Sequence, residues 1–139
     1  MGKTIDKFLK DIDAKADSCQ KTSANFKLIC EAWTTCQADW DKYEPEMLKL
    51  KNWEDHPYAK KRIAVWEKGK SLSADLLKNA NEMNTIISGF NVYISKREKS
   101  KNPFRSKKSL PAARGMIDTY SKVAKDYVQL ALHGRSLFR

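Results

Sequence analysis

The strongest constraint on the fold is a run of large apolar residues that recur at alternating steps of three and four between positions 26 and 47. The residues on this stripe are Phe26, Ile29, Trp33, Cys36, Trp40, Tyr43 and Met47. Heptad spacing places them on one face of an α-helix, and three repeats are typical of a helix that packs lengthwise against another. The stripe predicts a helix that begins at a Ser23 cap and ends or kinks near Tyr43, because Pro45 follows.

Three other segments also have helical periodicity. We expect helices over residues 5–20, 57–98 and 111–133, with Gly134 ending the last of them. The apolar stripe of the 57–98 segment keeps one phase through Gly69, and a glycine inside a helix costs only about 1 kcal/mol. The segment is therefore predicted as one long helix, with a break at Gly69 as the alternative. Small residues around Gly69 indicate either a close approach of two helices or a hinge.

The scarcity of chain breakers supports the same fold class. The chain contains five Gly and four Pro, and no segment alternates apolar and polar residues over the length of a strand. The predicted fold is all-α: an antiparallel helical bundle of four helices, or five if a short helix follows Pro45. It has a long third helix and a basic loop before the last helix. Residues 1–139 are expected to form a single domain, since this is an ordinary length for one core.

The charge of the chain is strongly positive and unevenly placed. The formal net charge is +10, from 27 Lys and Arg against 17 Asp and Glu. Residues 1–57 contain 9 basic and 11 acidic side chains, whereas residues 58–139 contain 18 and 6. Such an excess indicates an anionic partner for the C-terminal half: nucleic acid, membrane headgroups or an acidic protein face. The alternative, weighted equally, is a solubility device with an exposed loop.

The densest positive segment is the predicted loop over residues 96–109. Seven of its fourteen residues are Lys or Arg, and only Glu98 is acidic. Clustered cations with an aromatic residue could bind phosphates and stack on a base, or bind anionic lipid and insert a wedge. A short basic tail follows at residues 134–139. The candidate anion-binding residues are Lys96, Arg97, Lys99, Lys101, Phe104, Arg105, Lys107 and Lys108.

A secondary basic cluster lies at the start of the 57–98 segment, at Lys60, Lys61 and Arg62. If that segment is one helix, the two clusters lie roughly 50 Å apart at a rise of 1.5 Å per residue. They would then not form one compact patch, which argues against a single face that reads a nucleic-acid duplex. No helix-turn-helix or basic zipper can be placed in the sequence.

Catalytic and metal-binding patterns are weak throughout. The two histidines, His56 and His133, have no ligand-type partner at helical spacing, although Glu54, Asp55 and His56 could bind a metal weakly. Carboxylates beside aromatic residues over positions 39–46 fit a helix with a wet outer face better than a sugar-cleaving site. There is no phosphate-binding glycine loop. We therefore expect no metal, no cofactor and no catalytic residue.

The cysteines and the tryptophans point to packing and to a reducing compartment. Cys19, Cys30 and Cys36 form an odd set without zinc spacing, which favours free thiols in the cytosol. The tryptophans are expected mainly in the core, with Trp53 partly exposed. No apolar signal region and no run of about 18 apolar residues is present, so the predicted location is cytoplasmic. Export by a route without a signal stays open.

The functional prediction is a small, soluble, non-catalytic helical-bundle protein that binds an anionic partner through its basic C-terminal half. The partner would be a nucleic acid, an acidic protein or an anionic membrane surface. A protein–protein interaction module is the first alternative: an adaptor, modulator, immunity-type or assembly protein whose heptad stripes continue into a partner or into a second copy of itself. A small toxin or effector that acts on a membrane or a macromolecule is the second.

Overall fold

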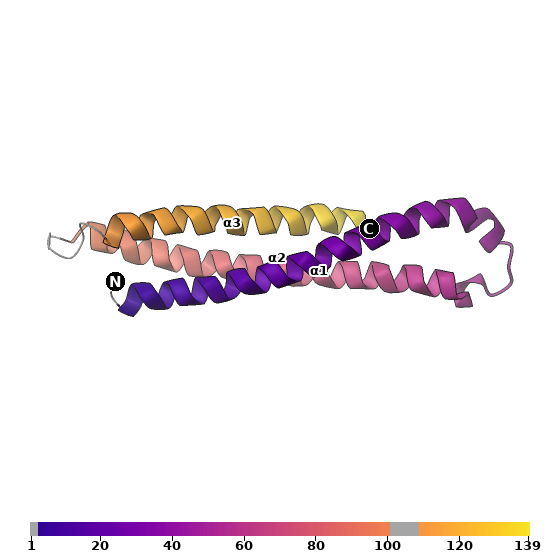
Figure 1. Cartoon of the computed structure of the whole chain (residues 1–139), viewed down its shortest axis with the longest axis horizontal. Coiled ribbons are helices and arrows are strands. Elements are labelled where there is room, and N and C mark those ends of the chain that lie inside the picture. Colours follow the sequence, from indigo (N-terminus) through magenta and orange to yellow (C-terminus); the bar gives the residue numbers. More distant parts are fainter. Residues whose placement is uncertain (1–2, 101–108) are drawn as a thin grey trace.

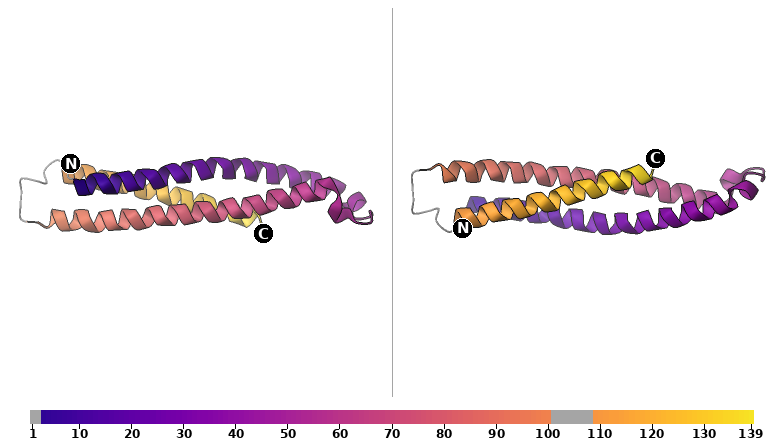
Figure 2. Two further views of the ribbon diagram at one scale, coloured as in Figure 1. Left: turned by 90° about the horizontal axis from the view of Figure 1, so that it is seen from below. Right: turned by 90° about the horizontal axis from the view of Figure 1, so that it is seen from above.

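The computed structural model describes residues 3–100 and 109–139, which form a long rod (Figure 1). Helix α1 spans Lys3–Met47, α2 spans Pro57–Glu98 and α3 spans Ser109–Leu137. A short 3-10 helix, η1 (Trp53–Asp55), lies in the connection between α1 and α2. Helices α1 and α2 run antiparallel along the whole rod, and α3 returns along α2 but ends partway, as the two side views of Figure 2 show.

The prediction of four or five helices is wrong, because the two N-terminal helices are one continuous α1. Every seventh residue along α1 is buried, and this single phase runs through the expected break near residues 20–23. The Ser23 hydroxyl donates to the Gln20 carbonyl oxygen at 2.9 Å inside the helix and does not cap it. The buried residues at this spacing are Ile5, Ile12, Cys19, Phe26, Trp33, Trp40 and Met47.

Pro45 does not end the first long helix at Tyr43 either, since α1 continues to Met47. Pro45 removes one backbone hydrogen bond of the helix, and only two residues of α1 follow it, so little helix remains to be disturbed. Helix α2 is unbroken through Gly69. Its start is defined by Pro57 in the first turn and by His56, whose Nδ1 accepts a hydrogen bond from the Tyr58 amide at 3.1 Å.

The core runs along the rod between the three helices. Near the start of α1, completely buried side chains from α1, α2 and α3 meet, among them Ile12, Phe90 and Ala113. The Phe8 ring stacks on Phe90 with centroids 5.1 Å apart. Farther along, Phe26, Leu76 and Ala131 form the centre of a second cluster. This region, in which all three helices pack together, is called the three-helix half below.

Two glycines allow the close packing where α3 ends. A Cβ atom on Gly69 would overlap the Phe138 ring, and one on Gly134 would overlap the Phe26 ring. Gly69 is therefore a point of close approach, and Gly134 lies buried inside α3, which continues past it to Leu137. The prediction that Gly134 ends the last helix is wrong for this reason. The Trp33 indole donates to the Leu137 carbonyl oxygen at 2.8 Å and so anchors the end of α3.

Beyond the end of α3 only α1 and α2 remain paired (Figures 1 and 2). Residues 36–63 form this part of the rod and are called the distal hairpin. Its small core is built on Trp40, Met47 and Ala59. The Trp40 ring is parallel to the Tyr58 ring and tilted against Trp53, with centroids 6.4 Å and 5.8 Å apart respectively. Trp53 is half-buried in this cluster.

Candidate anion-binding surface

The excess positive charge of the sequence is distributed unequally among the helices. Helix α1 contains 7 Lys and 9 Asp or Glu. Helix α2 contains 8 basic and 4 acidic residues, and α3 contains 4 and 2. The surfaces that α2 and α3 present to solvent are therefore positive, whereas the α1 surface is slightly negative.

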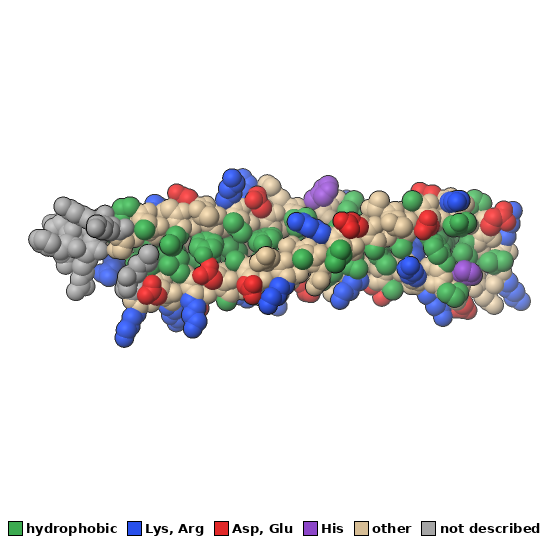
Figure 3. Space-filling view, viewed as in Figure 1, with side chains coloured by type: hydrophobic (Ala, Val, Ile, Leu, Met, Phe, Trp, Pro, Cys, Tyr) green, Lys and Arg blue, Asp and Glu red, His purple; other side chains and the backbone are tan. Residues whose placement is uncertain are grey.

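The charges of the distal hairpin balance. Residues 36–63 contain 6 Lys or Arg and 6 Asp or Glu. Figure 3 shows both signs of charge close together at this end of the rod. The net positive charge of the described residues therefore belongs to the three-helix half.

Few cations of α2 and α3 are neutralised within the protein. The salt bridges among the described residues are Lys15–Glu82, Lys21–Asp17, Lys49–Glu46 and Arg114–Glu98. Arg114 is the one cation of α2 or α3 that takes part in them. The hydrogen bond from Lys15 lowers the pKa of Glu82, which keeps that carboxylate ionised and engaged with α1. The other cations on these two helices form no salt bridge among the described residues.

A cavity of about 620 Å³ lies between α2 and the end of α3. Its α2 residues recur at helical spacing over positions 70–81, so they share one side of the helix. Four of the lining residues are cations and none is a carboxylate. The lining residues are Lys70, Ser73, Ala74, Leu77, Lys78, Asn81, Arg135, Phe138 and Arg139.

The floor of this cavity is apolar and well packed. Phe138 is 1% exposed and rests on Gly69. The buried Ser73 hydroxyl donates to the Ala131 carbonyl oxygen at 2.9 Å, which ties α2 to α3 at the floor. At the rim, the Lys70 ammonium lies 4.2 Å from the centroid of the Trp66 ring. The cavity thus combines a positive rim with a floor that can cover hydrocarbon.

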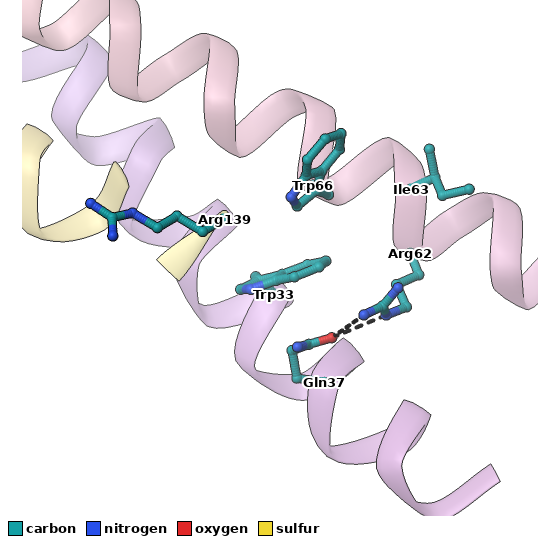
Figure 4. A pocket seen from close by; sticks show the side chains of 6 residues that line it. All are labelled: Trp33, Gln37, Arg62, Ile63, Trp66 and Arg139. Atoms are coloured by element: carbon teal, nitrogen blue, oxygen red, sulfur yellow. Dashed lines mark hydrogen bonds between the residues drawn. The ribbon is translucent and has the colours of Figure 1, made fainter. Parts of the chain in front are cut away.

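A second cavity of about 290 Å³ lies beside the end of α3, between α1 and α2. Figure 4 shows the rings of Trp33 and Trp66 on its opposite sides. Arg62 Nε and Nη2 both donate to Gln37 Oε1, at 3.0 Å and 2.8 Å. The Arg62 guanidinium also lies 4.7 Å from the centroid of the Trp40 ring. Arg62 is therefore held by the protein itself and covers the aromatic rings beyond the end of α3.

The residues predicted from sequence fall into three groups. Lys60 and Lys61 are exposed in the distal hairpin. The third member of their cluster, Arg62, is instead held by Gln37. Lys96, Arg97 and Lys99 are exposed at the far end of α2. The remaining candidates lie outside the described residues: Lys101, Phe104, Arg105, Lys107 and Lys108.

The two basic clusters lie at opposite ends of α2, as its unbroken length requires. Within the end cluster, the Arg97 guanidinium lies 5.5 Å from the centroid of the Tyr93 ring. Lys96 and Lys99 take part in no salt bridge with another described residue. These three cations are the part of the predicted loop site that the structure describes.

Other candidate groups have structural roles or no neighbours of suitable type. His56 caps α2, and His133 is exposed on α3. Burial raises the pKa of the Cys19 thiol and of the Cys30 thiol, so neither is an activated nucleophile. Over residues 3–100 and 109–139, no group of three or more His, Cys, Asp or Glu side chains could hold a metal ion. Among the same residues, no helix has the length and apolar character needed to span a bilayer.

Sequence reasoning missed the cavity between α2 and α3. Lys70 and Lys78 are eight residues apart on α2, and Arg135 and Arg139 belong to a tail that was noted only as basic. Their convergence depends on where α3 ends against α2, which no local pattern gives. The one available signal was the spacing of Lys70 and Lys78 on the side of α2 that also presents Leu77.

Comparisons with protein-family models, with curated proteins and with solved structures gave no significant match.

Proposed function

We propose that this is a non-catalytic binding protein that recognises an anionic macromolecule or membrane surface through α2 and α3 of its three-helix half. The observation that supports this most strongly is the charge: nine of the 12 Lys and Arg on α2 and α3 lie in the three-helix half, against six Asp and Glu, and Arg114 alone of these cations forms a salt bridge within the described residues. Exposed cations cost little folding free energy, so a positive charge by itself is also explained by its effect on solubility. The concentration of that charge on two of three helices favours a partner.

The arrangement suits an extended anionic partner. Lys78 and Lys96 are exposed and eighteen residues apart, which is five helical turns, so they lie on the same side of α2. From Lys70 to Lys99 the helix rises about 44 Å at 1.5 Å per residue. A nucleic-acid duplex or the plane of an anionic membrane could contact cations over that length. An acidic protein surface is the third form that the partner could take.

A titration with a labelled DNA duplex, repeated over a series of salt concentrations, tests the proposal. The logarithm of the affinity should fall linearly with the logarithm of salt concentration, because each phosphate contact releases counterions. The triple variant Lys96→Gln, Arg97→Gln, Lys99→Gln should bind more weakly and reduce the slope by up to about three. Anionic and neutral vesicles, used in the same way, give the corresponding test for a membrane.

The matched control changes the same number of charges in the balanced distal hairpin. The variant Lys42→Gln, Lys51→Gln, Lys61→Gln should keep most of the affinity and nearly the whole slope, since all three residues are exposed there. The proposal fails if neither DNA nor anionic vesicles bind at low salt. It also fails if the two triple variants lose affinity equally, because only net charge would then matter.

The distal hairpin favours a second candidate function, a protein–protein interaction module. Apolar side chains are exposed there although the local charges balance: Tyr43 is 48% exposed, Leu48 49%, Leu50 51% and Ile63 46%. A second copy or another helical protein could cover them. Sedimentation equilibrium over a wide concentration range checks self-association. A constant monomer mass would remove the second copy as the partner.

We also propose a cytoplasmic location. Cys19, Cys30 and Cys36 are free thiols, and thiols stay reduced in the cytoplasm. Mass-spectrometric thiol labelling of the protein from its native source should modify all three after denaturation. A disulfide in that material would contradict this location.

A further inference from the structure

We propose that the cavity between α2 and the end of α3 binds a small amphipathic anion, in which a carboxylate, sulfate or phosphate group is joined to a hydrocarbon chain. This inference rests on the proposed function, because it names the class of anion that the positive surface takes up at one place. The same chemistry occurs in a free fatty acid and in a membrane lipid. The experiment below separates these two sources.

The size of the cavity fits such a ligand. Its volume of about 620 Å³ lies within the range of roughly 300–1,000 Å³ that is typical of small-molecule sites. Phe138 is fixed in the floor by Gly69 and contacts the Phe26 and Trp33 rings at centroid distances of 6.1 Å and 5.5 Å. The floor is therefore formed before any ligand arrives, so binding would require little rearrangement of the protein.

Neighbouring carboxylates offset only part of the charge around the cavity: Lys78 also lines the cavity that contains Asp75 and Glu82, whereas Lys70, Arg135 and Arg139 do not. Lys70, Lys78, Arg135 and Arg139 line it, no carboxylate does, and none of the four forms a salt bridge within the described residues. Four like charges around one cavity repel one another, and an anion among them would reduce that repulsion. Arg135 and Arg139 are four residues apart at the end of α3, where both can reach one acidic group.

The apolar part of the ligand has a separate place to lie. Ala74 is exposed and Leu77 is half-buried, one helical turn apart on α2. A chain that runs along this side of α2 would cover both while its acidic end stays among the cations. An inorganic anion leaves these side chains in water, so it gains only the electrostatic part of the interaction.

The two neighbouring cavities are smaller and have fewer cations. The cavity between Trp33 and Trp66 is lined by Arg62, which is already bonded to Gln37, and by Arg139, which also lines the larger cavity. The cavity near Asn79 is lined by Lys15 and Lys78 but also by Asp75 and Glu82, so its charges balance. Of these three cavities, the one between α2 and the end of α3 has the largest volume and the most lining cations.

Calorimetric titration of the full chain with decanoate tests the proposal. Decanoate should bind at one site, with inorganic phosphate and decanol each at least about tenfold weaker, because each supplies only one half of the interaction. The variant Lys78→Gln, Arg135→Gln should weaken decanoate binding by about tenfold or more. The matched variant Lys122→Gln, Lys125→Gln changes two exposed cations of α3 outside the cavity and should bind decanoate as the unmodified protein does.

A variant in the floor checks the apolar half of the site. Leu77→Asn should weaken decanoate binding and leave phosphate binding unchanged, and circular dichroism should show the same helix content as in the unmodified protein. The proposal is overturned if phosphate binds as tightly as decanoate. It is equally overturned if the matched Lys122 and Lys125 variant loses as much decanoate affinity as the cavity variant.

Vesicles distinguish the source of the ligand and separate this proposal from the proposed function. If the protein binds phosphatidylglycerol vesicles and decanoate displaces it from them, the ligand of the cavity is a membrane lipid. If the protein binds decanoate but not the vesicles, the ligand is a free acid. Salt-dependent binding of DNA by a protein that takes up no decanoate would overturn the cavity proposal and leave the proposed function intact. A decanoate site on a protein that binds neither DNA nor vesicles would overturn the proposed function alone.

Discussion

In the three-helix half, a third helix covers the buried stripe of α1, whereas in the distal hairpin aromatic rings cover it. Within the three-helix half Ile12, Cys19 and Phe26 are each 0% exposed and Ile5 and Trp33 are 5% and 6% exposed, and in the hairpin Trp40 and Met47 are each 8% exposed, so the stripe stays buried along the whole of α1. The same seven-residue repeat is thus covered by a third helix in one region and by aromatic rings and the Arg62 guanidinium in the other.

A heptad stripe therefore predicts a buried face but not the kind of group that covers it. Small residues accompany α3 in the three-helix half: Ala113, Ala124 and Ala131 are all completely buried. Large rings replace the missing helix in the hairpin, where Trp40, Trp53 and Tyr58 pack on one another. The two regions also differ in net charge: the charges of the distal hairpin balance, whereas the three-helix half is positive. Stability and anion binding are therefore expected to reside in the same half.

The largest expected effect is the loss of a buried ring from the three-helix half. Phe90→Ala should lower the free energy of unfolding of the whole molecule by about 3–5 kcal/mol, because Phe90 is 0% exposed and packs against Phe8. Trp40→Ala should lower it by less, since the hairpin can open without α3. Urea unfolding followed by far-ultraviolet circular dichroism measures both. If the two variants lowered the free energy of unfolding equally, the two regions would not differ in their contribution to stability.

The next effect concerns the glycines where α3 ends. Gly69→Ala and Gly134→Ala should each destabilise the protein by about 1–3 kcal/mol, because the added methyl group meets an aromatic ring. Gly115→Ala is the control on α3. It has open space around its Cβ position and should stabilise the protein by up to about 1 kcal/mol through helix propensity. Thermal unfolding would contradict this account if all three variants shifted the transition in the same direction.

A smaller effect is expected from Arg62 in the distal hairpin. Arg62→Ala should cost about 1 kcal/mol, because it removes two hydrogen bonds to Gln37 and the contact with the Trp33 and Trp40 rings. It should also shift tryptophan emission to the red as these rings become wetter. Lys61→Ala alters the adjacent exposed position, and its effect should stay within about 0.5 kcal/mol. Identical emission spectra for the two variants would show that Arg62 does not cover the rings.

The smallest effect is a pH dependence confined to the three-helix half. The Tyr120 hydroxyl donates a hydrogen bond to Asp13, and this bond raises the pKa of Tyr120 from its ordinary value of 10.0 to about 12. Because the folded state holds the proton more tightly, the resulting stability is fully present below pH 10.0 and is lost as the pH rises through about 12. Ultraviolet titration should show a lower Tyr120 pKa in Asp13→Asn, although one still above the ordinary value, because burial of the ring also raises it. An unchanged titration in that variant would exclude the Asp13 contact as the cause.

Much of the helical content could be predicted from periodicity alone. The 57–98 segment was expected as one helix, and α2 has those ends because Pro57 opens it and its stripe keeps one phase. The break near Ser23 was predicted wrongly because a serine was read as a cap. The phase from Cys19 to Phe26 continues without a shift, and burial of that stripe outweighs the local preference of serine.

The candidate site could be predicted only in part. The cluster of adjacent cations over residues 96–109 was the main candidate, and three of those cations are exposed at the end of α2. The cavity depends on Lys70, Lys78, Arg135 and Arg139, whose separation along the chain is large. They meet because Phe138 docks on Gly69, and a glycine inside a helix can equally indicate a hinge. Contacts of this kind are decided by tertiary packing.

Hydrogen–deuterium exchange of the intact protein, with and without the DNA duplex or anionic vesicle that it binds, would show whether anions bind the three-helix half through α2 and α3. We expect slower exchange over residues 70–99 and 122–139 when the anion is present, with no change over residues 36–63. Slowing confined to the distal hairpin, or to α1, would contradict this expectation.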